Sequence, residues 1–369
     1  MPRHLAEPGA ALLTGSYAQH PVGCGPFRFV RYQPDEQIVL EANDDYWDGR
    51  PIIDRLVFRI YPDQRTAYQA MLTGDLDIMA ATSNLWHEAR ESAKAPRLGS
   101  FVYYRLSVYN IRWNQDGTNP FFTDPRVRRA MLMATDREQF LEKMLHGLGR
   151  VATTTYHPDL PWTDPDLKPL PHDPEAAGRL LDEAGWRDGD GDGVRERDGR
   201  PFRFTLMIIS STQQIVDQMA AWLQQSWSEV GVEAEIEKLE WSFYRERRNS
   251  GQFEAALGGL ATTPIPDQYE LYHSTARATG VNYIGFADAE VDRLLELGRT
   301  TFDEAERTRH YHRLQRRLHE LQPIGCLVHF ANPVLLDGRL RGVEPSPMDY
   351  WRTTRGPRFW RWADGTDKG

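Results

Sequence analysis

The stretch that decides the fold spans residues 21–80 and reads PVGCGPFRFVRYQPDEQIVLEANDDYWDGRPIIDRLVFRIYPDQRTAYQAMLTGDLDIMA. Short apolar runs bounded by turn residues are typical of strands, and apolar residues at helical spacing before a glycine are typical of a helix end. We therefore predict three strands, a short helix ended by Gly74, and a fourth short strand. These elements run over 27–29, 38–40, 56–60, 66–72 and 76–79. The order predicts a compact mixed α/β unit.

Two further blocks extend the pattern along the chain. Residues 106–140 read LSVYNIRWNQDGTNPFFTDPRVRRAMLMATDREQF, an aromatic-Asn strand followed by a proline-started helix. Residues 253–295 contain FEAALGGL, PDQYELYHS and NYIGFADAEVDRLL. In order and spacing, the three blocks resemble the extracellular solute-binding proteins of family 5, which are receptors of ABC importers. The family pattern GTGPF…NPDYW…GxxDI has Thr where this chain has Cys24.

The resemblance implies a fold and a division into domains. It implies an α/β, periplasmic-binding-protein-like type II fold of two lobes joined by a hinge, with the first lobe incomplete. Residues 1–105 would be the remnant of the first lobe and 106–335 the second, ligand-binding lobe, with 336–369 returning to the first. The implied function is capture of a peptide or similar small solute by lobe closure and its delivery to the permease subunits in the membrane. The implied location is periplasmic or extracellular, with a membrane anchor.

The beginning of the chain carries a further expectation. Pro2-Arg3-His4-Leu5 is similar to the I-x-P-K-H-L motif that lies inside the mature proteins of the family. No basic-then-apolar leader and no lipid-attachment cysteine stand near Met1. We expect the chain to correspond to the C-terminal portion of such a receptor. The strands at 26–30 and 56–60 would then lie in a sheet with unpaired edges and an exposed apolar face.

Composition excludes some partners. A formal net charge of −9 over 369 residues disfavours a nucleic-acid partner, which selects a basic face. No run of 18 apolar residues is present, so no segment reads as a membrane span. The two cysteines, Cys24 and Cys326, lie far apart in sequence, and we expect free, buried thiols rather than a bridge.

The second and third blocks hold the candidate ligand-binding residues. The resemblance places ligand contacts at the entry to the second lobe, at a strand-to-helix turn, in the loop 258–269 and just beyond it. Aromatic faces and amide donors suit a peptide and a sugar equally. For each tryptophan a place in the core is the alternative. The candidates are Trp113, Asn114, Trp241, Gly258, Gly259, Asp267, Tyr269, Asn282 and Tyr283.

One departure from the family pattern bears on the ligand. Peptide-binding members carry an Asp in this loop that pairs with the α-ammonium group of the peptide. Here Leu260 and Ile265 replace the Trp and the first Asp of that pattern, and Asp267 alone remains. A buried ammonium ion needs a carboxylate partner, because an unpaired buried charge is costly. The sequence therefore favours an uncharged or differently anchored ligand, such as a sugar or a modified peptide, more than the family alone does.

An Asp-Gly loop offers a possible metal site. Asp188, Asp190, Asp192 and Gly193 match the first half of an EF-hand loop. The glutamate expected at the twelfth position is replaced by Gly199, and Glu196 occupies the ninth. One interpretation is a polar turn that uses Asp and Gly for its geometry. The other is a weak structural Ca²⁺ site formed by Asp188, Asp190, Asp192 and Glu196, and the sequence indicates no other cofactor.

The sequence does not favour an enzyme. It contains no G-x-S-x-G elbow, P-loop or H-E-x-x-H motif. Besides the receptor, two alternatives remain open at this point. They are a calcium-stabilised surface or adhesion module, which rests on the Asp-Gly loop, and a receptor fragment without function.

Overall fold

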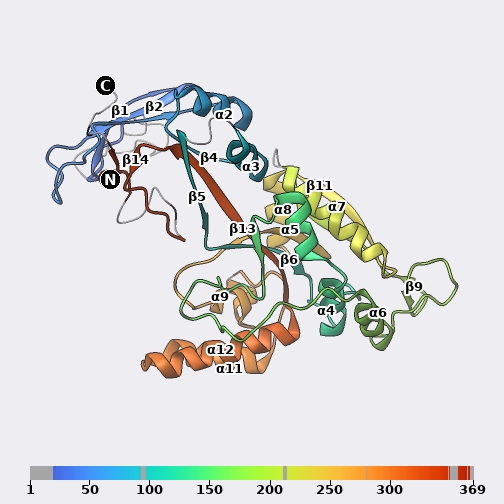
Figure 1. Ribbon diagram of the computed structural model, residues 1–369. Coiled ribbons are helices and arrows are strands. Elements are labelled where there is room, and N and C mark those ends of the chain that lie inside the picture. Colours follow the sequence, from blue (N-terminus) through green and yellow to red (C-terminus); the bar gives the residue numbers. More distant parts are fainter. Residues whose placement is uncertain are drawn as a thin grey trace. The chain divides into compact units, whose positions relative to one another are not determined.

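The computed structural model describes residues 20–92, 97–210, 214–279, 281–347, 349, 356–363 and 365. It divides the chain into two compact units (Figure 1). Unit 1 comprises Met1–Arg105 and Ala331–Gly369, and unit 2 comprises Leu106–Phe330. The chain therefore passes from one unit to the other twice. The motif at residues 2–5 and parts of the C-terminal segment lie outside the described residues.

Unit 1 begins with a three-stranded antiparallel sheet, in the order β1-β2-β3. The strands are β1 (Phe27–Gln33), β2 (Gln37–Ala42) and β3 (Arg55–Arg59). They include the strands predicted from sequence, and a register shift between Phe29 and Arg31 interrupts the β1–β2 ladder. The connection after β3 leads into α2 (Gln64–Thr73), which Asp63 caps at its start and Gly74 ends with a left-handed φ of 86°.

Apolar side chains of this sheet are open to solvent. Val39 is buried, but several apolar residues on or beside the strands are at least one-third exposed. They are Val30 41%, Tyr32 54%, Val57 41%, Phe58 36% and Ile60 43%. The expectation of an exposed apolar face is confirmed for these residues.

The rest of unit 1 surrounds the second half of a long strand, β13 (Ile324–Asp337). From Ala331 to Asp337, β13 pairs antiparallel with β5 (Leu98–Tyr104), and from Val334 to Leu336 also with β4 (Ile78–Ala80). Tyr68 of α2 is almost completely buried in a cluster with Leu85 of α3 (Ser83–Glu91). Smaller elements complete the unit: β14 (Leu340–Arg341), η3 (Pro357–Phe359) and β15 (Arg361–Trp362).

Unit 2 is built on a mixed sheet in the order β11-β10-β12-β6-β13, with β7 also paired to β13. β10 is parallel to both β11 and β12, whereas β6 is antiparallel to β12 and to the first half of β13. The strands are β6 (Ser107–Trp113), β7 (Gly149–Val151), β10 (Arg203–Ile209), β11 (Glu233–Leu239) and β12 (Ala255–Ala261), with a short hairpin of β8 (Glu196–Arg197) and β9 (Arg200–Pro201).

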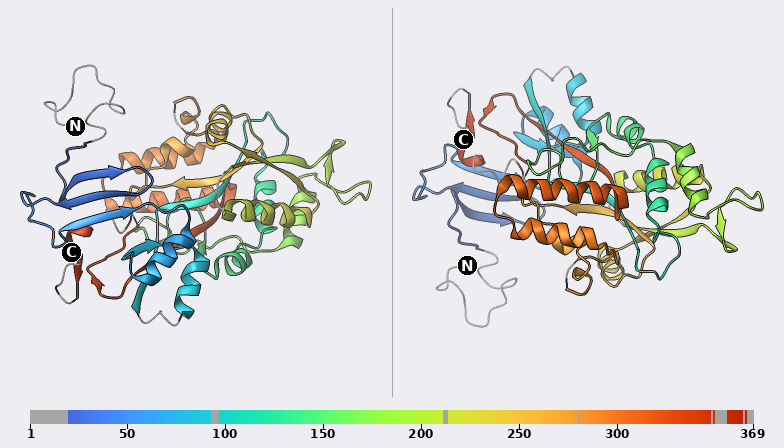
Figure 2. Two further views of the ribbon diagram at one scale, coloured as in Figure 1. Left: turned by 90° about the horizontal axis from the view of Figure 1, so that it is seen from above. Right: turned by 90° about the horizontal axis from the view of Figure 1, so that it is seen from below.

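Helices cover both faces of this sheet. Alternate strand residues enter two separate apolar clusters: Leu206 joins one and Met207 the other. The first cluster packs on α4 (Pro125–Met133), α5 (Arg137–Leu145), α6 (Pro174–Glu183) and α7 (Gln214–Ser228). The second packs on α8 (Trp241–Asn249), α9 (Tyr269–Tyr272), α11 (Ala289–Thr300) and α12 (Glu304–Leu321), and the short α10 (Ala276–Thr279) contacts α9. In Figure 2 the long helices α11 and α12 lie side by side.

Aspartate caps explain where most of these helices begin. Asp124, Asp136 and Asp173 each accept a hydrogen bond from a backbone N–H in the first turn, as their sequence position predicts. Within the part of the chain that the structure describes, no helix is both long enough and apolar enough to cross a membrane.

The two cysteines are free and differ in burial. Cys326 lies in β13, and burial raises the pKa of its thiol to about 12. Cys24 is exposed, so the prediction of a buried thiol was wrong for this residue. Cys24 lies in the glycine-rich turn before β1, where no packed face covers it.

Candidate ligand-binding site

Two glycines shape the middle of unit 2. Gly258 and Gly259 lie in β12, opposite Asn110 and Tyr109 of β6. A Cβ placed on Gly258 would lie only 2.9 Å from the hydroxyl oxygen of Tyr244, so any side chain here would displace that ring. Gly259 is exposed, and its missing Cβ would make ordinary contact with Tyr109. A bare, partly open backbone therefore runs along this strand.

The candidate carboxylate Asp267 is already engaged. Its Oδ2 accepts a hydrogen bond from Nε of Arg299 at 2.8 Å, and its Oδ1 accepts one from the backbone N–H of Tyr269 at 3.0 Å. Both members of the ion pair are partly exposed. The charge of Asp267 is thus balanced within the protein, and no free carboxylate is presented at this point of the loop.

Two planar side chains pack against the ring of Tyr269. Its ring stacks on His273 with centroids 4.0 Å apart, and the Arg299 guanidinium lies 3.8 Å from the Tyr269 centroid. The Tyr269 hydroxyl lies 3.1 Å from Oγ1 of Thr275. These contacts stabilise one ring orientation and leave less of the aromatic surface for a ligand.

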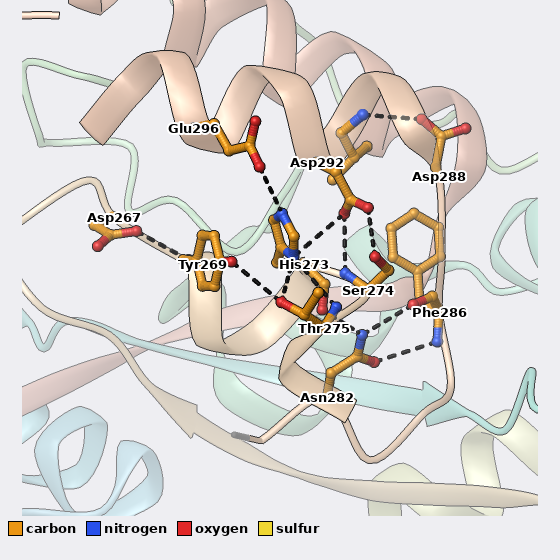
Figure 3. Close-up of polar contacts among 11 residues, drawn as sticks. Asp267, Tyr269, His273, Ser274, Thr275, Asn282, Phe286, Asp288, Asp292 and Glu296 are labelled. Carbon is orange, nitrogen blue, oxygen red and sulfur yellow. Dashed lines mark hydrogen bonds and ion pairs between the residues drawn. The ribbon is translucent and has the colours of Figure 1, made fainter. Parts of the chain in front are cut away.

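Asn282 fixes the chain after α10 (Figure 3). It is 1% exposed, and its Nδ2 donates to the carbonyl oxygens of His273 and Phe286, at 3.1 and 2.9 Å. Its Oδ1 accepts from the Phe286 N–H. Because its amide is fully used, Asn282 holds the loop together in this structure.

His273 lies at the centre of the same network (Figure 3). Its Nδ1 is 2.8 Å from Oγ1 of Thr275 and 3.9 Å from Asp292, and its Nε2 is 3.4 Å from Glu296. Sequence reasoning missed this histidine, because its acidic partners Asp292 and Glu296 come from α11. The network connects the loop 258–269 to a helix of the second cluster.

Two candidates from the second block are structural. Trp113 is completely buried and packs against Phe122 and Trp227, with ring centroids at 4.7 and 6.0 Å. Asn114 is 1% exposed and donates to the carbonyl oxygens of Gly251 and Phe253. The core alternative therefore describes Trp113, because β6 directs it into the first cluster. In this structure neither side chain is available to a ligand.

Trp241 has the opposite surroundings. It is 52% exposed at the start of α8 and stacks on Tyr244, with centroids 6.1 Å apart and ring planes 16° apart. The guanidinium of Arg248, near the end of the same helix, lies 4.9 Å from the ring of Tyr283 and 6.0 Å from that of Trp241. Trp241 and Tyr283 are thereby brought to the same cationic side chain.

Sequence reasoning missed Arg112, which lies between these groups. It is 5% exposed at the next-to-last position of β6, and the described residues form no ion pair with it. Burial lowers its pKa, the Tyr244 hydroxyl opposes this shift, and the charge of Arg248 adds to it. A cation in a predicted strand beside Ile111 and Trp113 was the available signal.

The Asp-Gly loop places three of its four candidate ligands together. Carboxylate oxygens of Asp188, Asp190 and Glu196 lie within 4.8 Å of one another. The same carboxylates accept hydrogen bonds from the loop's own backbone, including those from Gly191 to Asp188 and from Gly189 to Glu196. Asp192 accepts from the N–H of Val194 instead and is not part of this group. These hydrogen bonds from backbone N–H groups to carboxylates are those of a polar turn, which was the first of the two interpretations of the loop.

Comparison with solved structures identifies the class of fold. A mixed α/β chain forms two units connected by two crossings. It is similar to the solved oligopeptide-binding protein AppA from Bacillus subtilis in complex with a nonapeptide, with a TM-score of 0.76 and 29% identity, over 93% of this chain and 67% of that one. The solved protein AppA from Clostridium difficile, at 21% identity, shows the same fold with a TM-score of 0.84, over 98% of this chain and 72% of that one. The fold is that of the periplasmic-binding-protein-like structures.

Sequence comparison identifies the family. The model for bacterial extracellular solute-binding proteins, family 5 Middle, matches residues 2–282, so the chain belongs to this family. It is 30% identical to the Bacillus subtilis oligopeptide-binding protein AppA, over 89% of this chain and 60% of that protein. It is 28% identical to heme-binding protein A of Haemophilus influenzae, over 89% and 58%, and 30% identical to di/tripeptide-binding protein 1 of Pseudomonas aeruginosa, over 88% and 59%. The chain spans about 60% of the length of these curated relatives.

Proposed function

We propose that this chain captures a small solute, such as a peptide or a peptide-like compound, as the receptor component of an ABC importer. Family membership over residues 2–282 carries the proposal. The names of similar proteins give it direction, since they bind oligopeptides, heme or di- and tripeptides. These relatives are binding proteins, and we propose that this chain likewise performs no chemistry of its own and needs no cofactor.

The proposed mechanism is closure of the two units on the solute. Two chain crossings between compact units are the arrangement that hinge motion uses. A solute that contacts both units binds the closed form more tightly and so increases its population. The permease would then recognise that form outside the cytoplasmic membrane, either in the periplasm or on the cell surface.

Within unit 2, we propose a ligand-facing surface made of Trp241, Tyr283 and the backbone of Gly258 and Gly259. Trp241 and Gly259 are exposed, and bare strand backbone offers N–H and C=O groups to an extended ligand. We assign the remaining candidates to support. Trp113 and Asn114 stabilise the sheet, and Asn282 stabilises the loop that carries Tyr283.

A ligand-dependent thermal shift tests the function. The purified chain is heated with pools of di- to pentapeptides and, separately, with neutral oligosaccharides. A solute that binds only the folded protein, at a free concentration about one hundred times its Kd, stabilises the protein by about 2.7 kcal/mol. This corresponds to a rise in Tm of several degrees.

Trp241→Ala is the matched variant, because an exposed side chain is removed without loss of core packing. We expect it to keep the ligand-free Tm and to weaken the shift. If no pool raises the Tm of the natural chain, the receptor function is rejected for this chain.

A further inference from the structure

Arg112 occupies an unusual position for a charged side chain. It lies in β6, between its neighbours Ala256 of β12 and Ile324 of β13, and is 5% exposed. A buried cation is normally paired or saturated with hydrogen bonds, because its desolvation is otherwise uncompensated. The partners of Arg112 therefore decide whether it serves the fold or something outside the protein.

Other buried arginines of unit 2 show what saturation looks like. Arg128 is 2% exposed and donates to the carbonyl oxygens of Phe122, Thr123, Leu321 and Gln322, at 2.6 to 3.1 Å. These bonds connect α4 to the end of α12. Its guanidinium is a structural clamp, with donors directed to backbone groups that need them.

Arg112 lacks such a set. Its Nη2 donates to the carbonyl oxygen of Gly259 at a long 3.4 Å. Among the described residues its other acceptor is the Tyr244 hydroxyl, which in turn donates to the carbonyl oxygen of Leu257 at 3.1 Å. No carboxylate of the described chain pairs with Arg112. Most of the donors of this guanidinium are thus left without a strong acceptor.

A second cation strengthens the imbalance. Arg248 bonds the side chain of its neighbour Asn249 and lies over the rings of Tyr283, Tyr244 and Trp241. It too has no carboxylate partner among the described residues. Its charge acts on Arg112, so two like charges are held near each other without a counter-ion. An anion placed beside both would relieve this repulsion.

Space and polarity around Arg112 are also consistent with an external acceptor. A Cβ on Gly258 would lie 3.4 Å from Nη1 of Arg112 and 2.9 Å from the Tyr244 hydroxyl, so Gly258 lets both groups approach the strand, and the next residue, Gly259, is exposed. Asn110, directly opposite Gly258, is fully buried, and its Oδ1 accepts no hydrogen bond from the described chain. An unused acceptor and unused donors therefore lie beside the same bare glycine.

The sign of charge at the candidate site is opposite to that needed for an ammonium group. The remaining loop carboxylate, Asp267, is neutralised by Arg299 at 2.8 Å. Arg112 and Arg248 have no such partner. The described part of unit 2 therefore offers uncompensated positive charge to a ligand.

We propose that Arg112, assisted by Arg248, anchors a carboxylate group of the solute beside Gly258 and Gly259. The planar fork of a guanidinium matches a carboxylate with two parallel hydrogen bonds. The rings of Trp241, Tyr244 and Tyr283 lie against the guanidinium of Arg248. The inference rests on the proposed receptor function and defines its substrate class as solutes with an acidic group.

Substitution of Arg112 by methionine separates the two roles of a buried arginine. Methionine keeps the length and removes the charge. If Arg112 served the fold, as Arg128 does, the ligand-free Tm would fall. Because Arg112 has few partners, we expect Arg112→Met to keep or raise the ligand-free Tm. Arg112→Lys keeps the charge but loses the fork. Arg247→Met is the matched control, since Arg247 lies next to Arg248 in α8 and pairs with Glu237.

The probes are two matched peptide pools that differ only in whether the C-terminal carboxylate is free. One is a pool of N-acetylated tripeptides with a free carboxylate, and the other is the same pool with the carboxylate amidated. We expect the natural chain and Arg247→Met to bind the acids about ten- to one-hundredfold more tightly than the amides, as expected for a charge-assisted hydrogen-bonded pair. The preference should disappear in Arg112→Met and partly return in Arg112→Lys.

The outcomes distinguish the inference from the function. If amides or neutral sugars bind as well as acids, or if Arg112→Met keeps the preference, the carboxylate anchor is overturned and the receptor function stands. A lower ligand-free Tm of Arg112→Met with the acid preference intact would likewise assign Arg112 to the fold. If no probe binds the natural chain, both the function and the anchor are rejected.

Discussion

The sheet of unit 2 and the three-stranded sheet of unit 1 contain similar strands in different surroundings. In β10, Phe204, Leu206 and Ile208 are buried beneath helices, and Met207 is buried on the other face. In β3, the equally apolar Val57 and Phe58 are 41% and 36% exposed. The comparison teaches that an apolar strand sequence specifies a strand and a potential core, whereas burial depends on the elements that later cover it.

The largest expected difference comes from matched tryptophan truncations. Trp227 is completely buried in unit 2 and donates to the carbonyl oxygen of Met131, while Trp47, in the connection between β2 and β3, is 82% exposed. We expect Trp227→Ala to lower the free energy of unfolding by about 3–5 kcal/mol and Trp47→Ala to change it by less than about 0.5 kcal/mol. Urea unfolding followed by circular dichroism measures both.

Equal losses in the two variants would contradict the comparison, because they would mean that Trp47 is as well packed as Trp227. The two units need not unfold in one step, so midpoints are compared for each transition.

The pH dependence of stability tests the burial of His329 in the sheet of unit 2. This residue of β13 is 2% exposed, its Nδ1 lies 2.8 Å from the carbonyl oxygen of Ser107, and burial lowers its pKa from 6.5 to about 4. Below pH 6.5 His329 becomes protonated in the unfolded chain, whereas in the folded chain it stays neutral until about pH 4. Stability should therefore fall as the pH decreases through this window, by at most about 3 kcal/mol.

His329→Gln removes the titration and keeps a side-chain donor for Ser107. We expect the Tm of this variant to depend less on pH between 6.5 and 4, with similar values for both proteins at pH 8. Parallel Tm curves over the whole range would refute the assignment to His329.

A smaller effect is expected at the surface of the three-stranded sheet. Val30→Thr and Val57→Thr keep the β-branch and replace an exposed methyl group by a hydroxyl. We expect the double variant to keep its Tm within about 1–2 °C and to bind less of a dye that reports apolar surface. A clear drop in Tm would show that both side chains are more deeply packed than their 41% exposure indicates.

The smallest effect concerns the Asp-Gly loop, which lies outside both sheets. Its carboxylates already accept backbone hydrogen bonds, so we expect 1 mM Ca²⁺ to raise the Tm by less than about 1 °C. A rise of several degrees that is lost in Asp190→Ala would instead assign a calcium site to Asp188, Asp190 and Glu196.

Much of the local structure could be predicted because its signals lie close together in the chain. Asp124, Asp136 and Asp173 start helices by bonding N–H groups two or three residues away. Gly74 ends α2 because it adopts a left-handed φ of 86°. The family resemblance likewise rested on short ordered blocks, and the family match over residues 2–282 confirmed it.

The candidate site was less predictable, because its side chains acquire their roles from distant partners. Trp113 and Trp241 are the same residue type, yet one is in the core and the other is 52% exposed. Asp267 was identified, but its pairing with Arg299, 32 residues away, was not.

The sequence by itself determined the strands, the helix ends and the family, because hydrophobic period, caps and glycines act within a few residues. Only the tertiary structure decided which apolar strands are covered and which charges are compensated. Arg112 shows the reason most directly: the carbonyl oxygen that it bonds, of Gly259, lies 147 residues away. Burial and pairing are properties of surfaces that folding brings together, and no local pattern encodes them.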